Sequence, residues 1–200
     1  MTEFGVARVT VRQAMSILAA EGLVARHRGR GTFVCGMPED TRWLRLGTTM
    51  EALSTMFAGT KPRLLMITDT VAAPILTAND GFPAQRYRYM KRVHSQGDVP
   101  YAVIGIYLAA DLFARAPKRF RNETVIPLLR SLGGVNIARG RQNLTIGTAD
   151  METAELLRVP VNSPIAEVRR VFCDETGRVI YLGEVRYRGD FIHLEIDLTP

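Results

Sequence analysis

Residues 6–34 read VARVTVRQAMSILAAEGLVARHRGRGTFV, and this stretch decides how the start of the chain folds. Apolar residues recur in it every three or four positions, as on one face of a helix: Val11, Ala14, Met15 and Leu18. Arg8, Arg12 and Ser16 fall together on another face. Gly22 follows this run, and glycine readily takes the left-handed conformation that ends a helix. The pattern predicts a helix with one apolar and one basic face, ending near that glycine.

A basic hairpin is predicted directly after this helix. Residues 23–25 are apolar, residues 28–31 read RGRG, and residues 32–34 read TFV, which is the pattern of a strand, a tight turn and a strand. Glycines at the turn leave the backbone free to lie close to a duplex. A basic helix followed by a basic hairpin suits the major groove and the neighbouring phosphates. The alternative is an ordinary amphipathic helix with a solvated face, and the hairpin favours nucleic-acid binding over it.

Composition restricts the class of protein. The chain has 200 residues, 46% of them hydrophobic, which is enough for a core in one large or two small domains. Its formal net charge of +6 favours an anionic partner. Cys35 and Cys173 lie far apart without metal-ligand spacing, which indicates a reduced, cytoplasmic protein. No apolar run reaches the roughly 18 residues of a membrane span, so we expect no membrane partner.

The stretch GVARVTVRQAMSILAAEGLVARHRGRGTFV resembles the winged helix-turn-helix of the GntR family of bacterial transcription regulators. The resemblance rests on the V-R-Q-A core of the helix and on the R-G-R-G-T-F-V hairpin. It implies that double-stranded DNA is the partner. The DNA-binding residues that it implies are Arg8, Thr10 and Arg12 on the recognition helix and Arg28, Gly29 and Arg30 at the wing tip. Arginine suits this role because it can bond two acceptors of one guanine and can meet phosphate oxygens.

This resemblance covers only the second half of such a domain. A helix-turn-helix needs another helix before the recognition helix, and only residues 1–4 precede Gly5 here. We therefore expect the winged helix-turn-helix to be partial. Residues 36–42 read GMPEDTR, a polar segment with one glycine and one proline, and they indicate an interdomain linker.

Beyond the linker the chain mixes helices with strands in hairpins, which predicts an α+β domain with an antiparallel sheet. The predicted helices cover residues 49–58, 109–114, 124–132 and 150–158. The predicted strands cover residues 63–73, 84–95, 99–108, 142–149, 165–173, 178–188 and 191–198. Residues 48–51 have the spacing of a capping box at the first of these helices, and residues 116–122 are expected to form a basic loop.

This order of elements resembles the UTRA ligand-binding domain of HutC-type GntR regulators, which has a chorismate-lyase-like fold. The most specific pieces are Val99-Pro100 before a strand ending in Tyr107-Leu108, residues 149–165 (ADMETAELLRVPVNSPI), and Tyr187-Arg188-Gly189-Asp190. The resemblance implies a homodimer that binds a small-molecule effector and a palindromic operator. The expected parts are a partial winged helix-turn-helix at 1–35, a linker at 36–43, and an effector-binding and dimerisation domain at 44–200.

The effector site of sugar-phosphate-sensing UTRA domains is altered in this sequence. Their Arg-x-Arg pair reads Arg92-Val93-His94 here, the expected glutamate falls at Ile104, and the tyrosine of their Ser-x-Tyr pattern falls at Ile126. Because isoleucine cannot hydrogen-bond a polyol, we expect a less polar effector with an acidic group. Arg92, the Thr124 hydroxyl and the amides at that helix start would hold its acid.

The effector-binding residues implied are Arg92, His94, Thr124 and Tyr187. Each also has an ordinary structural interpretation. Arg92 would be a solvated strand residue, His94 a hydrogen-bonded histidine, Thr124 a helix cap and Tyr187 a core residue.

The function expected from this reasoning is that of a transcription regulator, a repressor, whose operator affinity changes when the effector binds. One alternative is an effector-binding and dimerisation module with a non-functional DNA head. A lyase-like enzyme is the third hypothesis, but the sequence has no Ser-His-Asp set, no clustered metal ligands and no glycine-rich phosphate loop. Its three histidines, His27, His94 and His193, fall in different segments. We therefore expect no enzyme, no catalytic or metal-binding residues and no cofactor.

Overall fold

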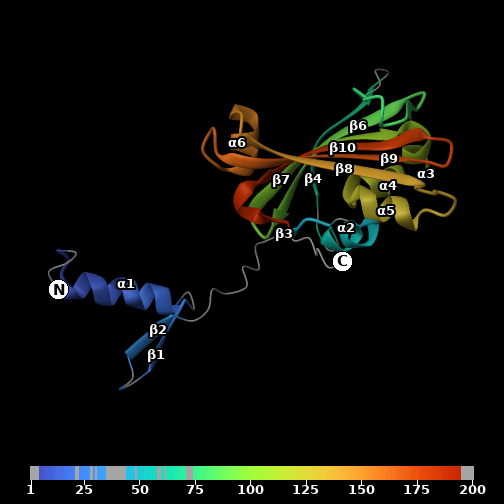
Figure 1. Cartoon of the computed structure of the whole chain (residues 1–200). Coiled ribbons are helices and arrows are strands. Elements are labelled where there is room, and N and C mark those ends of the chain that lie inside the picture. The colour runs from blue at the N-terminus through green and yellow to red at the C-terminus, as the bar shows by residue number, and fades with distance from the viewer. Residues whose placement is uncertain are drawn as a thin grey trace. The chain divides into compact units, whose positions relative to one another are not determined.

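A helix and a two-stranded hairpin are the described elements of the first of two units in the computed structural model of the chain (Figure 1). Helix α1 spans Arg8–Ala20, and strands β1 and β2 span Val24–His27 and Gly31–Val34. The two strands pair antiparallel, with Val24 opposite Val34. The predicted helix and hairpin are both present, in the predicted order.

The two units comprise Met1–Arg42 and Trp43–Pro200, and each is described by itself. The residues that the structure describes are 5–20, 23–27, 29, 31–34, 44–47, 49–57, 60, 62–70 and 74–194. Arg28, Arg30 and the linker predicted over residues 36–43 lie outside them.

A seven-stranded sheet forms the body of the second unit. Its strands are β4 (Arg63–Thr70), β5 (Phe82–Pro83), β6 (Tyr87–Gln96), β7 (Val99–Ala109), β8 (Arg139–Thr148), β9 (Pro164–Cys173) and β10 (Arg178–Arg188). They follow the order β4-β6-β7-β10-β9-β8, with β5 paired to β10 beside this path. Every described pair along the path is antiparallel, as the sequence predicts, whereas β5 runs parallel to β10.

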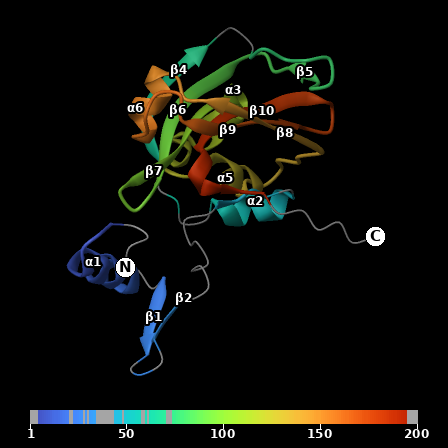
Figure 2. The ribbon, with the colours of Figure 1, turned by 60° about the vertical axis from the view of Figure 1, so that its left-hand side comes forward.

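Helices cover both faces of this sheet. They are α2 (Met50–Met56), α3 (Ala110–Arg115), α4 (Pro117–Asn122), α5 (Val125–Ser131) and α6 (Met151–Leu157). Helices α2 to α5 share a large core with the sheet, and α2 and α5 lie side by side there (Figures 1 and 2). Helix α6 packs in a smaller core with Val93 and Val103. Because successive strand residues point to opposite faces, Met90 on β6 faces α2 to α5, whereas Val93 faces α6.

Two predictions about helices need correction. The cap of α2 is Thr49, whose hydroxyl accepts a hydrogen bond from the Ala52 amide at 3.1 Å, one residue later than the predicted capping box. The predicted loop at 116–122 is instead α4, with proline in its first turn, where a missing amide hydrogen costs nothing. Sequence reading missed α4 because Phe120 is its only large apolar residue, so it shows no apolar period.

The end of the chain also differs from the prediction of a strand over 191–198. Gly189–Phe191 form a short 3-10 helix, and strand β11 covers only Ile192–His193. This strand pairs in parallel with β3 (Leu44–Arg45), not within an antiparallel sheet. The partner comes from the opposite end of the unit's sequence, so alternation within 191–198 could not indicate it. Residues 195–200 lie outside the described part of the chain.

Candidate DNA-contacting surface and effector pocket

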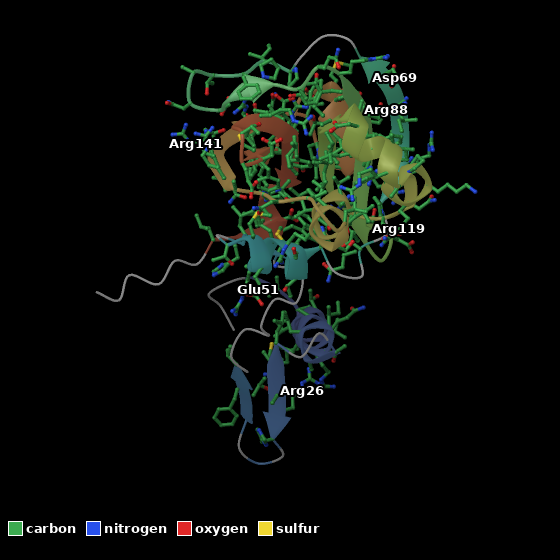
Figure 3. The ribbon with its side chains drawn as sticks, turned by 90° about the vertical axis from the view of Figure 1, so that its right-hand side faces the viewer. Arg26, Glu51, Asp69, Arg88, Arg119 and Arg141 are labelled. Atoms are coloured by element: carbon green, nitrogen blue, oxygen red, sulfur yellow. The ribbon has the colours of Figure 1, made fainter. Side chains whose placement is uncertain are left out.

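Arg8, Thr10 and Arg12 all lie exposed on helix α1. Their spacing places Arg8 and Arg12 one turn apart on the same face. Arg26 on β1 joins this face, because its Nη2 donates to the Arg12 carbonyl oxygen and to Ser16 Oγ, at 3.3 Å each (Figure 3). Sequence reasoning did not include Arg26 among the DNA-binding residues, since its contact depends on how the hairpin folds back on α1.

Gly29 lies at the tip of the hairpin with a φ of +79°, a backbone conformation that glycine adopts without strain. A Cβ added there would meet nothing within 4 Å. Gly29 itself therefore leaves space for a close approach by another molecule. The arginines on either side of it, Arg28 and Arg30, are outside the described residues.

A small pocket opens among β6, β7, β9, β10 and the start of α5. The described residues that line it are Phe57, His94, Ile104, Ile106, Thr124, Val125, Ile126, Arg170, Tyr181 and Val185. Two predicted effector residues, His94 and Thr124, thus line one pocket together with the isoleucines at 104 and 126. None of these lining residues is acidic, and most of them are apolar.

Arg92 is not among the residues that line this pocket. Its side chain is fully buried. Its Nη1 donates to the Glu123 carbonyl oxygen at 2.7 Å, and its Nη2 donates to the Phe120 carbonyl oxygen. Burial lowers the pKa of Arg92 to about 10, so the guanidinium is charged at neutral pH. In this structure Arg92 ties the junction of α4 and α5 to the sheet.

His94 is buried and lines the pocket. Neither of its ring nitrogens has a hydrogen-bond partner among the described residues. Burial, assisted by the positive charge of Arg92, lowers the pKa of His94 to about 3. The imidazole is therefore neutral at physiological pH and offers one N–H donor and one acceptor.

Arg170 on β9 lines the pocket but was missed by sequence reasoning. It is fully buried. Its Nε donates to Gln142 Oε1 at 2.5 Å and its Nη1 donates to the Tyr187 hydroxyl at 3.1 Å. Its Nη2 is buried without a partner among the described residues. The signal was available in the alternation of β9, since Arg170 occupies the same face as the core residues Val168 and Phe172.

Thr124 and Tyr187 are the other two predicted effector-binding residues. Thr124 is the N-cap of α5, and its side chain makes no capping hydrogen bond to the described helix. Tyr187 is fully buried, does not line the pocket, and stacks on Tyr101 with ring centroids 6.5 Å apart. Tyr187 is linked to the pocket by the hydrogen bond that its hydroxyl accepts from Arg170.

The described residues also contain no group of three or more histidine, cysteine or acidic side chains placed to hold a metal ion. Among the described helices, none combines the length and apolarity required to cross a bilayer.

Comparison with known proteins matches two parts of the chain. Residues 1–34 match the family model described as bacterial regulatory proteins of the gntR family, and residues 67–193 match the UTRA domain. The transcriptional repressor NagR of Bacillus subtilis is 26% identical over 196 residues, which cover 96% of this chain and 80% of NagR.

Solved structures agree with this fold. The crystal structure of PhnF from Mycobacterium smegmatis has a TM-score of 0.62 at 25% identity and covers 98% of this chain and 88% of that one. The structure of the possible transcriptional regulator YydK from Bacillus subtilis has a TM-score of 0.63 at 16% identity, covering 100% of this chain and 86% of that one.

Proposed function

The chain belongs to the GntR family of bacterial transcription regulators with a UTRA domain, and from this premise we propose that it is a repressor controlled by a small molecule. Members of this family are regulators and not enzymes. The single observation that carries the proposal is the joint presence of the two family matches in one chain. The gntR match covers a helix and a wing that suit DNA, and the UTRA match covers a domain with a pocket.

The DNA-binding residues of this proposal are Arg8, Thr10, Arg12, Arg28, Gly29 and Arg30, joined by Arg26. The exposure of Arg8, Thr10 and Arg12 on one helix supports the assignment. The carbonyl contact of Arg26 brings a further positive charge to the face that carries Arg12. Helix residues would read base edges in the major groove, and the wing would meet the backbone beside it.

The effector pocket of this proposal is lined by His94 and Thr124, while Arg92 and Tyr187 hold its walls in place. Effector binding would change operator affinity only if the effector prefers one arrangement of the repressor over another. We infer that the repressor is a homodimer and that it acts in the cytoplasm. A homodimer with two-fold symmetry would bind a palindromic operator whose half-sites match that symmetry.

Selection of duplexes from a random library by the full chain tests this function. We expect enrichment of a palindrome, and we expect small metabolites from cell extract to change the affinity for it. Arg12→Ala should weaken operator binding by about 1–3 kcal/mol, whereas Arg141→Ala, an exposed arginine of β8 in the other unit (Figure 3), should leave it unchanged. Failure to enrich any sequence, with effector binding retained, would instead identify an effector-binding module without operator recognition.

A further inference from the structure

The buried guanidinium of Arg170 has no carboxylate partner among the described residues. Its polar contacts there are neutral, namely the Gln142 amide oxygen and the Tyr187 hydroxyl. Its charge also lies over the rings of Phe57 and Tyr187, at 5.7 and 5.8 Å from the ring centroids. A fully buried cation without a counter-charge is costly. An anion in the pocket would remove that cost.

His94 presents a second polar group to the same pocket. It is neutral at physiological pH, so it can donate one N–H to an anion without adding a second positive charge. Both His94 nitrogens and Arg170 Nη2 are buried without partners in the described part of the chain. Groups of this kind usually mark a place where a water or a ligand supplies the partner.

The rest of the pocket limits what the anion can carry. The side chains of Ile104, Ile106, Val125, Ile126 and Val185 carry no hydrogen-bonding group, so among the other lining side chains only the hydroxyls of Thr124 and Tyr181 could bind a hydroxyl group. A phosphate ester brings close to two charges and three acceptor oxygens. The described lining contains one cationic side chain, Arg170. It therefore matches a carboxylate, with a single charge on two oxygens, better than a phosphate ester.

We propose that the pocket binds a small monocarboxylate with an apolar body, whose carboxylate is held by Nη2 of Arg170 and the N–H of His94. This inference rests on the proposed function, because it takes this pocket as the effector site. The residue that binds the acid is then Arg170 and not Arg92, because Arg92 already donates to backbone carbonyls. The apolar body lies against the isoleucine and valine side chains.

The pocket must widen when such a ligand enters. Its volume is about 20 Å³ in this structure, which is room for about one water molecule. Phe57 follows directly after α2 and forms part of the lining. A displacement of α2 would therefore enlarge the pocket, and ligand binding would be coupled to the position of that helix.

Calorimetric titration of the full chain at neutral pH with paired probes tests this inference. Benzoate and isovalerate are the carboxylates, and benzamide and isovaleramide are neutral partners of nearly equal shape. Inorganic phosphate and glucose 6-phosphate represent the alternative anions. We expect at least one carboxylate to bind at least about tenfold more tightly than its amide and more tightly than either phosphate. Equal binding of acid and amide, tighter phosphate binding, or no binding of either acid would overturn the inference.

Substitutions at Arg170 locate the binding group. Arg170→Met should reduce carboxylate affinity at least about tenfold, and Arg141→Met is the matched control on an exposed arginine of β8. If circular dichroism shows that Arg170→Met is unfolded, Arg170→Lys takes its place. Lysine keeps the charge but lacks the planar guanidinium with its several N–H donors, so this variant should still weaken binding of the acid relative to its amide. Unchanged carboxylate affinity in a folded Arg170 variant would contradict the proposal.

Operator binding separates this inference from the proposed function. If the chain binds its operator and responds to metabolites but binds neither carboxylate, the carboxylate assignment fails and the repressor function stands. If the carboxylates bind through Arg170 but no operator is selected, the site stands and the repressor function fails.

Discussion

His94 shows how one buried side chain links the pocket to the pH dependence of folding. Its pKa is lowered to about 3 in the folded chain, against 6.5 for an unperturbed histidine. Between these values the unfolded chain binds a proton that the folded chain does not. Stability therefore falls as the pH drops below 6.5, by up to about 1.4 kcal/mol per pH unit from this group.

Replacing this histidine should remove that sensitivity. Between pH 6.5 and 5, the wild type should lose about 2 kcal/mol more unfolding free energy than His94→Phe, because phenylalanine cannot bind the proton. Urea unfolding at each pH measures the difference. His27→Phe, at an exposed position of β1, is the control and should follow the wild type. Parallel profiles for wild type and His94→Phe would show that this imidazole is not held neutral.

Arg170 and Arg92 show what residue patterns could and could not predict about the pocket. The isoleucines at 104 and 126 and the pair His94 and Thr124 were placed from the resemblance, and they do line one pocket. Two partners of Arg92 are carbonyls about 30 positions away, and no local pattern indicates them. Arg170 looks like a charged residue of a solvated strand face until the alternation of β9 is followed through its neighbours.

At the scale of elements, the junction of α4 and α5 depends on a strand residue. Arg92 on β6 donates to the carbonyl oxygens of Phe120 in α4 and of Glu123 just before α5. Thr124, which caps α5 and lines the pocket, follows Glu123 directly. The tie therefore positions one wall of the pocket.

Arg92→Met should destabilise the second unit by about 2–4 kcal/mol, because two carbonyl groups lose a charged donor. It should also weaken effector binding indirectly by releasing the start of α5. Chemical denaturation followed by circular dichroism measures the loss, with Arg141→Met as the control. A change of less than about 0.5 kcal/mol, typical of an exposed site, would show that this tie contributes little.

The elements themselves were predictable where their signals are local. Helix α1, the cap at Asp150 and the hairpin of β9 and β10 all appear in the structure as expected, although none of the apolar residues that predict α1 is buried. The Asp150 side chain accepts from the Thr153 amide at 2.7 Å, as a cap should. Helix α4 and the parallel pair of β3 and β11 were not predictable, because packing and a distant partner decide them.

At the scale of the whole molecule, the chain joins a DNA-reading unit to a ligand-binding unit. A repressor of this kind works through a coupling free energy, and effectors typically change the affinity for a second ligand by about 5–150-fold. The ligand must prefer one operator-binding arrangement, since equal affinity for all arrangements shifts nothing. The widening of the pocket near α2 is a change that a ligand can favour.

The central claim is that this chain recognises an operator and that a small molecule changes that recognition. Fluorescence anisotropy of the full chain with its selected palindrome and with a scrambled duplex of equal length tests this most directly, with and without small metabolites from cell extract. We predict a preference of at least about a thousandfold for the palindrome, and a shift of at least about fivefold when the effector is present. Equal affinity for both duplexes, unchanged by any metabolite fraction, would contradict it.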